Sequence, residues 1–246
     1  MKNSILVLLF FALIFFGYAQ SVVPNNIRAA NTLDRLVEDG LSNADMLYGI
    51  PLPEGKIIGD TYLETQWKAA SILLYDKDKL IEGFPVRYDI YLNELEIKAK
   101  NGIKVLKGEK VKSFVWMDSL TNSPVYFVNA KEFQNADNVT LTGFFQVLTD
   151  GSLPLFKKTK VDVKKAHYNV QLNVGSLDDK ILKKDELYVG KGHQVIEVPS
   201  SKKKLLPLFG DKSEDIEKFI KENALTTSKE YHLTSIFKHY NSLVNN

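Results

Sequence analysis

The sequence predicts a mainly β (α+β) fold, namely an antiparallel β meander, barrel or sandwich with a C-terminal pair of amphipathic helices. Short runs of alternating apolar and polar residues follow one another from about residue 62 to residue 198, and this period of two is typical of half-buried strands. Glycine-containing turn signals separate the runs. After residue 211 the apolar residues instead recur at helical spacing.

The N-terminus has the three-part pattern of a secretory signal peptide. Lys2 precedes an unbroken run of 12 apolar residues, Ile5–Phe16, and the small residues Gly17 and Ala19 follow. A membrane-spanning helix needs about 20 apolar residues, so a cleaved signal is preferred to an uncleaved membrane anchor, which is the alternative. No transmembrane span is expected after signal removal. We expect a signal peptide over residues 1–19, cleaved near Ala19/Gln20, and a single domain over residues 20–246. Without a cysteine the chain is not expected to be a lipoprotein, so a secreted or periplasmic protein is predicted.

Composition excludes several classes of function. The 246 residues are 44% apolar and 25% charged, close to the average for a globular protein, and the lack of cysteine excludes disulfide scaffolds and iron–sulfur sites. There are 32 Lys+Arg against 30 Asp+Glu, but only three residues are arginine. Since nucleic-acid contacts favour arginine, no nucleic-acid partner is expected. The lysine runs at 157–165 and 202–204 are interpreted as solubility and edge protection, with contact to an anionic surface as the alternative.

The elements follow in order along the chain. Apolar spacing predicts a short helix over 27–38. Strict alternation over 84–92 predicts a strand, and the phase change at Asn93-Glu94 predicts a bulge or tight turn. Asn101-Gly102 predicts a type I′ hairpin turn. A further strand is expected over 111–117.

The second half of the sheet and the helices have similar signals. Hairpins are expected around Asp150-Gly151 and Gly190–His193, and alternation over 168–174 predicts a strand between them. The helices are predicted over 212–224, with Asp211 and Glu214 at its start, and over 228–243, after a capping box formed by Thr227 and Glu230. Both helices have an apolar stripe, which we expect to pack on the sheet.

No constellation of residues indicates catalysis. The chain contains four histidines, which are His167, His193, His232 and His239. The last two share a helix face but lie about 10.5 Å apart along the axis, too far for one zinc ion, and are interpreted as solvent-facing. No zinc, nucleophile, phosphate or calcium motif occurs. No catalytic, cofactor-binding or metal-binding residue is therefore predicted, and the ligand-binding residues are left open.

Carboxylates and aromatic residues were weighed as further candidates. The pairs Asp178-Asp179 and Asp185-Glu186 cannot act together within a strand, because neighbours point to opposite faces, and they are interpreted as a solvated loop. Aromatic residues could form a sugar-stacking platform or, as we prefer, core and cross-strand pairs; they are Tyr88, Tyr91, Phe114, Trp116, Tyr126 and Phe127. Asn138-Val139-Thr140 matches a glycosylation acceptor.

Several segments in order carry a resemblance to a known family. They are YGIPLPEG (48–55), FPVRYDIYLNELEIKAKNGIKVL (84–106), TGFFQVLTDGSLPLFKK (142–158) and KKKLLPLFG (202–210). The chain resembles an uncharacterised family of secreted β-rich proteins common in the Bacteroidota. That family has no established activity, so the resemblance implies location and fold type only.

These observations favour an exported, non-catalytic envelope protein that binds a ligand or a partner, such as an envelope protein or a glycan. A lipocalin-like or lipoprotein-carrier-like binder is one variant, which predicts a large apolar cavity. A glycan- or peptide-acting hydrolase with carboxylates from separate strands is an alternative of another class. A structural component of an envelope complex is a third hypothesis, and it requires an exposed apolar patch or strand edge.

Overall fold

The computed structural model describes residues 55–169 and 172–244. The predicted signal peptide and the predicted helix over 27–38 lie outside the described residues. Residues 55–166 and 178–244 belong to one compact unit, and residues 167–177 belong to another. No helix in the described part of the chain is long and apolar enough to cross a membrane.

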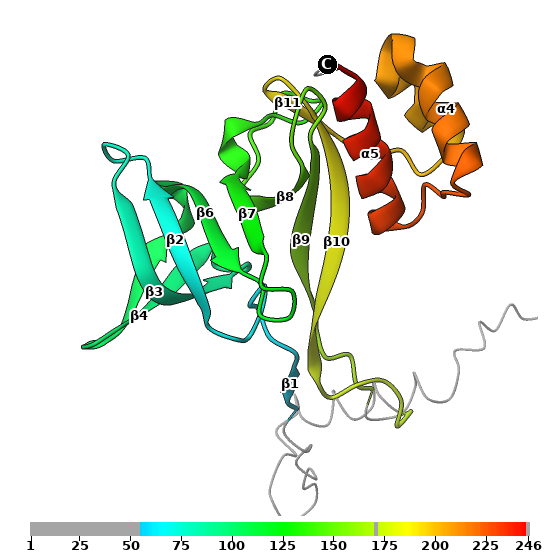
Figure 1. The fold of residues 1–246 in the computed structure, drawn as a ribbon. Coiled ribbons are helices and arrows are strands. Elements are labelled where there is room, and N and C mark those ends of the chain that lie inside the picture. The colour runs from blue at the N-terminus through cyan, green and yellow to red at the C-terminus, as the bar shows by residue number, and fades with distance from the viewer. Residues whose placement is uncertain (1–54, 170–171, 245–246) are drawn as a thin grey trace, which may run out of the picture. The chain divides into compact units, whose positions relative to one another are not determined.

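The first unit contains one large sheet followed by helices (Figure 1). Its strands are β1 (Ile57–Ile58), β2 (Lys68–Leu74), β3 (Leu80–Asp89), β4 (Glu94–Ala99), β5 (Gly102–Lys107), β6 (Val111–Met117), β7 (Pro124–Asn129), β8 (Phe144–Thr149), β9 (Leu155–Lys164), β10 (Asp179–Lys191) and β11 (Gln194–Glu197). Its helices are η1 (Gly108–Lys110), η2 (Ala130–Glu132), α3 (Lys202–Leu205), η3 (Leu206–Lys212), α4 (Ser213–Glu222) and α5 (Glu230–Val244).

The strands form a mixed sheet in the order β1-β10-β9-β8-β7-β6-β2-β3-β4-β5, with β11 also on β10. Every pairing is antiparallel except the short parallel contact of β1 with β10. Two meanders, β2–β5 and β6–β11, meet where β2 pairs with β6. This confirms the predicted antiparallel β fold, and because the sheet is not closed by a ladder it is a meander rather than a barrel.

The first meander has to curl, because its end must return to β6. In a flat sheet β5 would lie four strand spacings, about 19 Å, from β6, whereas the link η1 can span only about 14 Å. Figure 1 shows β2–β7 curled on one side of β9 and β10. The inside is filled by a first core, whose large side chains are Tyr88, Leu95, Phe114, Trp116, Phe127 and Phe144. The rings of Phe114 and Phe127 stack 4.4 Å apart.

A buried asparagine holds the curl at this link. Asn129 Nδ2 donates to the carbonyl oxygens of Gly108 at 2.9 Å and Val111 at 2.6 Å. The Gly108 N–H donates to Asn93 O at 2.8 Å. A Cβ on Gly108 would lie 2.3 Å from Asn93 Oδ1, so only glycine fits. The turn Asn93-Glu94 predicted from the phase change is therefore confirmed and is tied to β7 through this contact.

Helix α5 lies against the second meander and α4 packs on α5 (Figure 1), around a second core that is mainly aliphatic. Their spans confirm the predicted helices over 212–224 and 228–243 to within two residues. Asn241 of α5 is buried and holds both backbone groups of Leu153, at 2.9 and 3.1 Å. The predicted cap at Asp211 is wrong, because η3 continues to Lys212 and α4 begins at Ser213 without a side-chain cap. The Ser213 hydroxyl lies 2.7 Å from the carbonyl oxygens of both Leu206 and Gly210 and donates its hydrogen to this pair.

Two strand predictions in this half were wrong. In the described part of 168–174, an isolated bridge joins Asn169 and Val174 in place of a strand, because the Asn169 side chain accepts the Leu172 N–H at 2.9 Å and forms a local contact. Conversely, residues 179–186 of the expected loop belong to β10, a strand of 13 residues. The Asn101-Gly102 hairpin is confirmed, but Gly102 alone has a positive φ, so the turn is not type I′.

Candidate functional site

A cleft lies between the curled strands and the long β9–β10 pair. It consists of three adjoining cavities of about 350, 10 and 300 Å³, and Thr159 of β9 lines all three. The small cavity shares Lys157 with the first and Tyr88 with the third, so it lies between them. We call the first cavity the acidic end, lined by Leu63, Glu64, Trp116, Asp118, Val125, Phe127, Gln146, Lys157, Thr159, Lys183 and Asp185. The third is the lysine end, lined by Tyr88, Ile90, Tyr91, Asn93, Thr142, Gly143, Phe144, Lys158, Thr159, Lys160 and Val161.

The acidic end brings together three carboxylates from separate elements. Glu64 pairs with the buried Lys68 at 2.7 Å, and Asp185 accepts the Thr159 hydroxyl at 2.6 Å. Asp118 accepts hydrogen bonds from the backbone and hydroxyl of Thr121, and these bonds lower its pKa. A general acid requires a raised pKa, so the shift at Asp118 is in the wrong direction for that role.

The lysines of the acidic end are also paired internally. Lys157 Nζ lies 3.2 Å from Glu230 of α5, and Lys183 Nζ lies 2.7 Å from Asp60. Trp116 forms an apolar wall, but it is only 2% exposed. The charges at this end of the cleft are therefore satisfied within the protein.

The lysine end differs, because Lys158 has no carboxylate partner among the described residues. Its ammonium donates to Thr142 O at 2.7 Å and lies 5.7 Å from the centre of the Phe145 ring. Burial, followed by the charge of Lys160, lowers the pKa of Lys158 to about 8, while the charge of Glu186 acts against the shift. Keeping this half-buried ammonium charged therefore costs free energy.

Glu186 lies directly across the strand pair from Lys158 but is occupied by other donors. Lys160 binds it at 2.6 Å, Lys184 at 3.2 Å and the Tyr188 hydroxyl at 2.8 Å. Burial acts to raise the pKa of Glu186, but these three bonds lower it to about 2. Asp185 and Glu186 thus point to opposite faces of β10, as their spacing predicts, although the solvated loop expected for them is wrong.

Beside the lysine end, β9 has an unpaired edge. β10 pairs with all of β9, but β8 pairs only with residues 155–157. Gly143, with φ of +81°, directs its carbonyl to the Ala130 N–H at 2.8 Å, so the chain joins the sheet only at Phe144, where β8 begins. On this side, residues 158–164 have no ladder partner among the described residues.

The backbone direction shows which residues face this free edge. The Leu155 N–H donates to Thr149 Oγ1 at 3.0 Å, so it points toward β8. Backbone groups alternate in direction along a strand. Hence Thr159, Val161 and Val163 present N–H and C=O groups to the free edge, while the residues between them bond to β10.

The histidines and metal candidates lie away from the cleft lining. His232 Nδ1 accepts the Thr226 N–H at 2.9 Å, and the His239 ring stacks on Phe219 at 3.9 Å. Both are half-buried and hold the helical segment together, so their solvent-facing interpretation is wrong. His193 lies in an exposed turn. Among the described residues, no group of three or more Asp, Glu, His or Cys is placed to hold a metal ion.

The aromatic candidates are mostly in the core. Tyr88, Phe114, Trp116 and Phe127 are buried, whereas Tyr91 and Tyr126 are exposed. Tyr126 lines an open outer groove of about 510 Å³, whose other lining residues are Val128, Phe133, Val147, Asp150, Pro154 and Phe156. This groove is larger than either end of the cleft but offers few polar groups to orient a ligand. The cleft, which adjoins an open strand edge, is therefore the better candidate site.

The cleft could not have been found by motif, because its residues come from separate strands. Lys158 stood out only as part of a lysine run, and Asn138 of the glycosylation sequon lies in an exposed turn elsewhere. No known protein family, curated protein or solved structure matches this chain.

Proposed function

We propose that this chain is an exported, non-catalytic envelope protein that binds an extended segment of a partner polypeptide by adding it as a strand to the free edge of β9. The single observation that carries the proposal is the unpaired stretch 158–164 beside the cleft. Strand addition obtains its affinity from main-chain hydrogen bonds and its specificity from neighbouring pockets. The signal-like N-terminus over residues 1–19 supports export.

The dimensions of the edge suit an extended peptide. Thr159, Val161 and Val163 each offer one donor and one acceptor in the direction of the missing neighbour. The adjacent cavity of about 300 Å³ leaves room for side chains of the added strand. Its far wall is the β3–β4 turn, which includes Tyr91 and Asn93.

A partner chain fits this edge better than a second copy does. β9 carries Lys157, Lys158, Lys160 and Lys164 against one acid, Asp162. Pairing two such strands edge to edge would bring like charges close together, which is destabilising. Lysine on an edge is also a known device against self-association.

Selection of peptides from an unbiased display library tests the proposal. We expect the mature chain to retain extended peptides and Val161→Pro, which removes one N–H from the free edge, to lose them. Val161→Thr is the matched control, because it keeps the N–H and the β-branched side chain. Peptides that bind Val161→Pro as well as the unmodified chain would show that the edge is not the binding site.

A peptide-acting hydrolase is the second candidate, since three carboxylates from separate elements line the acidic end. All three have internal hydrogen-bond or ion-pair partners, and this favours binding over catalysis. Mass spectrometry of the selected peptides after long incubation separates the two functions. We expect intact peptides; cleavage that Asp185→Asn abolishes would instead establish the hydrolase.

A further inference from the structure

We propose that Lys158 binds a carboxylate of the added strand, so that the cleft selects acidic extended peptides. This inference rests on the proposed strand addition and specifies the chemistry of its ligand. It begins from the lysine end, where the described side chains leave positive charge without a carboxylate partner.

The geometry leaves Lys158 able to bind an anion. Of its three N–H donors, one is used by Thr142 O at 2.7 Å, and no other acceptor among the described residues lies within hydrogen-bond distance. The ammonium is half-buried beside the Phe145 ring, at 5.7 Å from its centre. A hydrogen bond between charged groups in such a partly dry position is stronger than one in open water.

The charged side chains around Lys158 also carry a net positive charge. Lys158, Lys160 and Lys184 surround a single carboxylate, Glu186, on this face of the β9–β10 pair. The oxygens of Glu186 already accept bonds from Lys160, Lys184 and Tyr188. A second carboxylate is therefore needed to pair Lys158, and the protein does not supply it.

The alternation of side chains along an added strand determines which of its positions can place a carboxylate beside Lys158. Side chains two residues apart share a face, so acidic residues at alternate positions would face Lys158 and Lys160 together. Cross-strand neighbours of this kind have Cβ atoms about 5 Å apart. The ligand is thus an extended segment with Asp or Glu at every second residue.

The lowered pKa of Lys158 gives the interaction a pH signature. The titratable groups around it are Lys160 on β9, Lys184 and Glu186 on β10, Tyr88 on β3 and Tyr91 on the β3–β4 turn. Above pH 8 the free protein loses the Lys158 proton, so affinity for an anion should be constant below pH 8 and fall above it. A bound anion should raise the pKa back toward its ordinary value.

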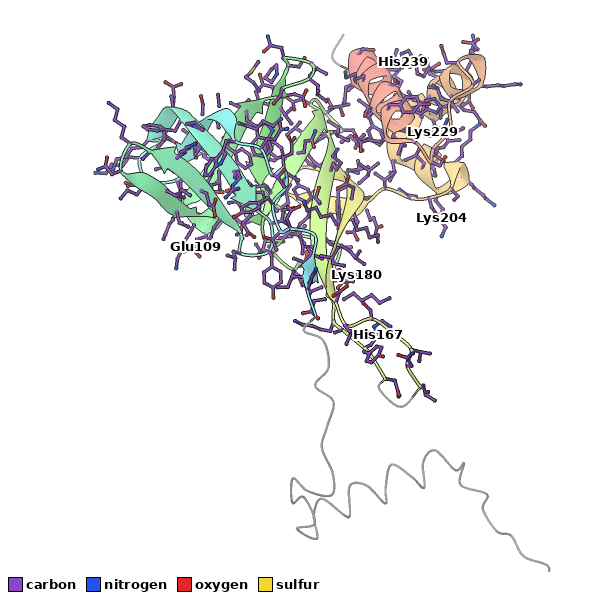
Figure 2. All side chains as sticks on the ribbon, turned by 90° about the horizontal axis from the view of Figure 1, so that it is seen from below. Glu109, His167, Lys180, Lys204, Lys229 and His239 are labelled. Carbon is purple, nitrogen blue, oxygen red and sulfur yellow. The ribbon has the colours of Figure 1, made fainter. Side chains whose placement is uncertain are left out.

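The first test needs no peptide. The pKa of Lys158 is measured by NMR of its side chain in sulfate and in chloride at matched ionic strength. We expect sulfate to raise it by about one unit, with no change at the exposed controls Lys180 and Lys204 (Figure 2). An equal response at all three lysines would overturn the anion site, whatever the outcome for strand addition.

The second test compares two blocked seven-residue peptides, one alternating Thr and Glu, the other alternating Thr and Gln. We expect the acidic peptide to bind about tenfold more tightly, the difference to disappear in Lys158→Gln and to return in Lys158→Arg. Equal binding of the two peptides would overturn carboxylate selection while leaving strand addition intact. Binding of neither peptide would contradict strand addition, and the sulfate titration would then decide the anion site alone.

Discussion

The two ends of the cleft lie on the same strand, β9, yet they handle charge in opposite ways. At the acidic end, Lys157, Lys183 and Asp185 each have a partner inside the protein, at 3.2, 2.7 and 2.6 Å. At the lysine end, Lys158 has a carbonyl but no carboxylate among the described residues. The charged side chains of the acidic end are thus paired within the protein, while Lys158 at the lysine end can still bind an anionic ligand.

The largest expected effect is a loss of unfolding free energy when Trp116, which lines the acidic end, is truncated. Trp116→Ala deletes a ring that packs on Phe114 and Phe127 in the first core. Loss of a buried aromatic side chain costs about 3–5 kcal/mol. Urea denaturation should show this loss of unfolding free energy. A loss below about 1 kcal/mol would mean that the curl is not held together by its aromatic core.

Two neighbouring proline substitutions should distinguish the paired and the free edge of β9. Asp162→Pro removes an N–H that bonds to β10 and should cost about 3 kcal/mol or more. Val161→Pro removes an N–H on the free edge and should cost about 1 kcal/mol. The difference in unfolding free energy between the two variants is the readout. Equal losses would indicate that the free edge has a partner.

Acidification should test the bonds to Glu186. Because its folded pKa of about 2 lies below the ordinary value of 4.5, Glu186 contributes stability above pH 4.5 that is lost as the pH falls toward 2. Thermal unfolding as a function of pH measures this contribution. Glu186→Gln should flatten the profile in that window. If the melting temperature of the variant fell with acidification as steeply as that of the unmodified chain, other carboxylates would account for the loss of stability at low pH.

The smallest expected effect is at Lys158, where a substitution should raise the stability of the protein instead of lowering it. Its folded pKa of about 8 lies below the ordinary 10.5, so between these values the unfolded chain binds more protons and stability rises with pH. Lys158→Met removes the burial penalty below pH 8. Its melting temperature should therefore exceed that of the unmodified chain at pH 7 and match it near pH 10. A lower melting temperature at pH 7 would mean that Lys158 is already well paired.

Much of the fold could be predicted from local pattern. The alternation around Val86 and Tyr88 and the helical stripes of α4 and α5 arise because one face of each element meets a core, although the strand predicted over 84–92 ends at Asp89. The first half of β10 was missed because its two apolar residues, Ile181 and Leu182, are adjacent and residues 183–186 are all charged, so this half carries no periodic apolar signal. In that segment the strand is stabilised by its antiparallel ladder to β9 and by ion pairs such as Lys160–Glu186, which depend on residues far along the chain.

The candidate site could not be predicted from local sequence patterns either, because it also depends on contacts between residues far apart in the chain. Asn129 and Asn241 resemble surface residues in sequence, but both are buried and bind backbone groups of distant loops. The free edge depends on where β8 begins, which Gly143 decides through its positive φ and its bond to Ala130. Strand order and edges are non-local properties, so Lys158 could be interpreted only as one lysine of a run.

The most direct test of the central claim is amide hydrogen exchange along β9 in the free protein. Because the backbone direction alternates, Thr159, Val161 and Val163 should exchange fast while Lys160 and Asp162 exchange slowly. Adding the acidic peptide should slow the three fast amides and restore uniform protection. Uniform protection of residues 158–164 before any peptide is added would contradict the account, because the edge would already be paired.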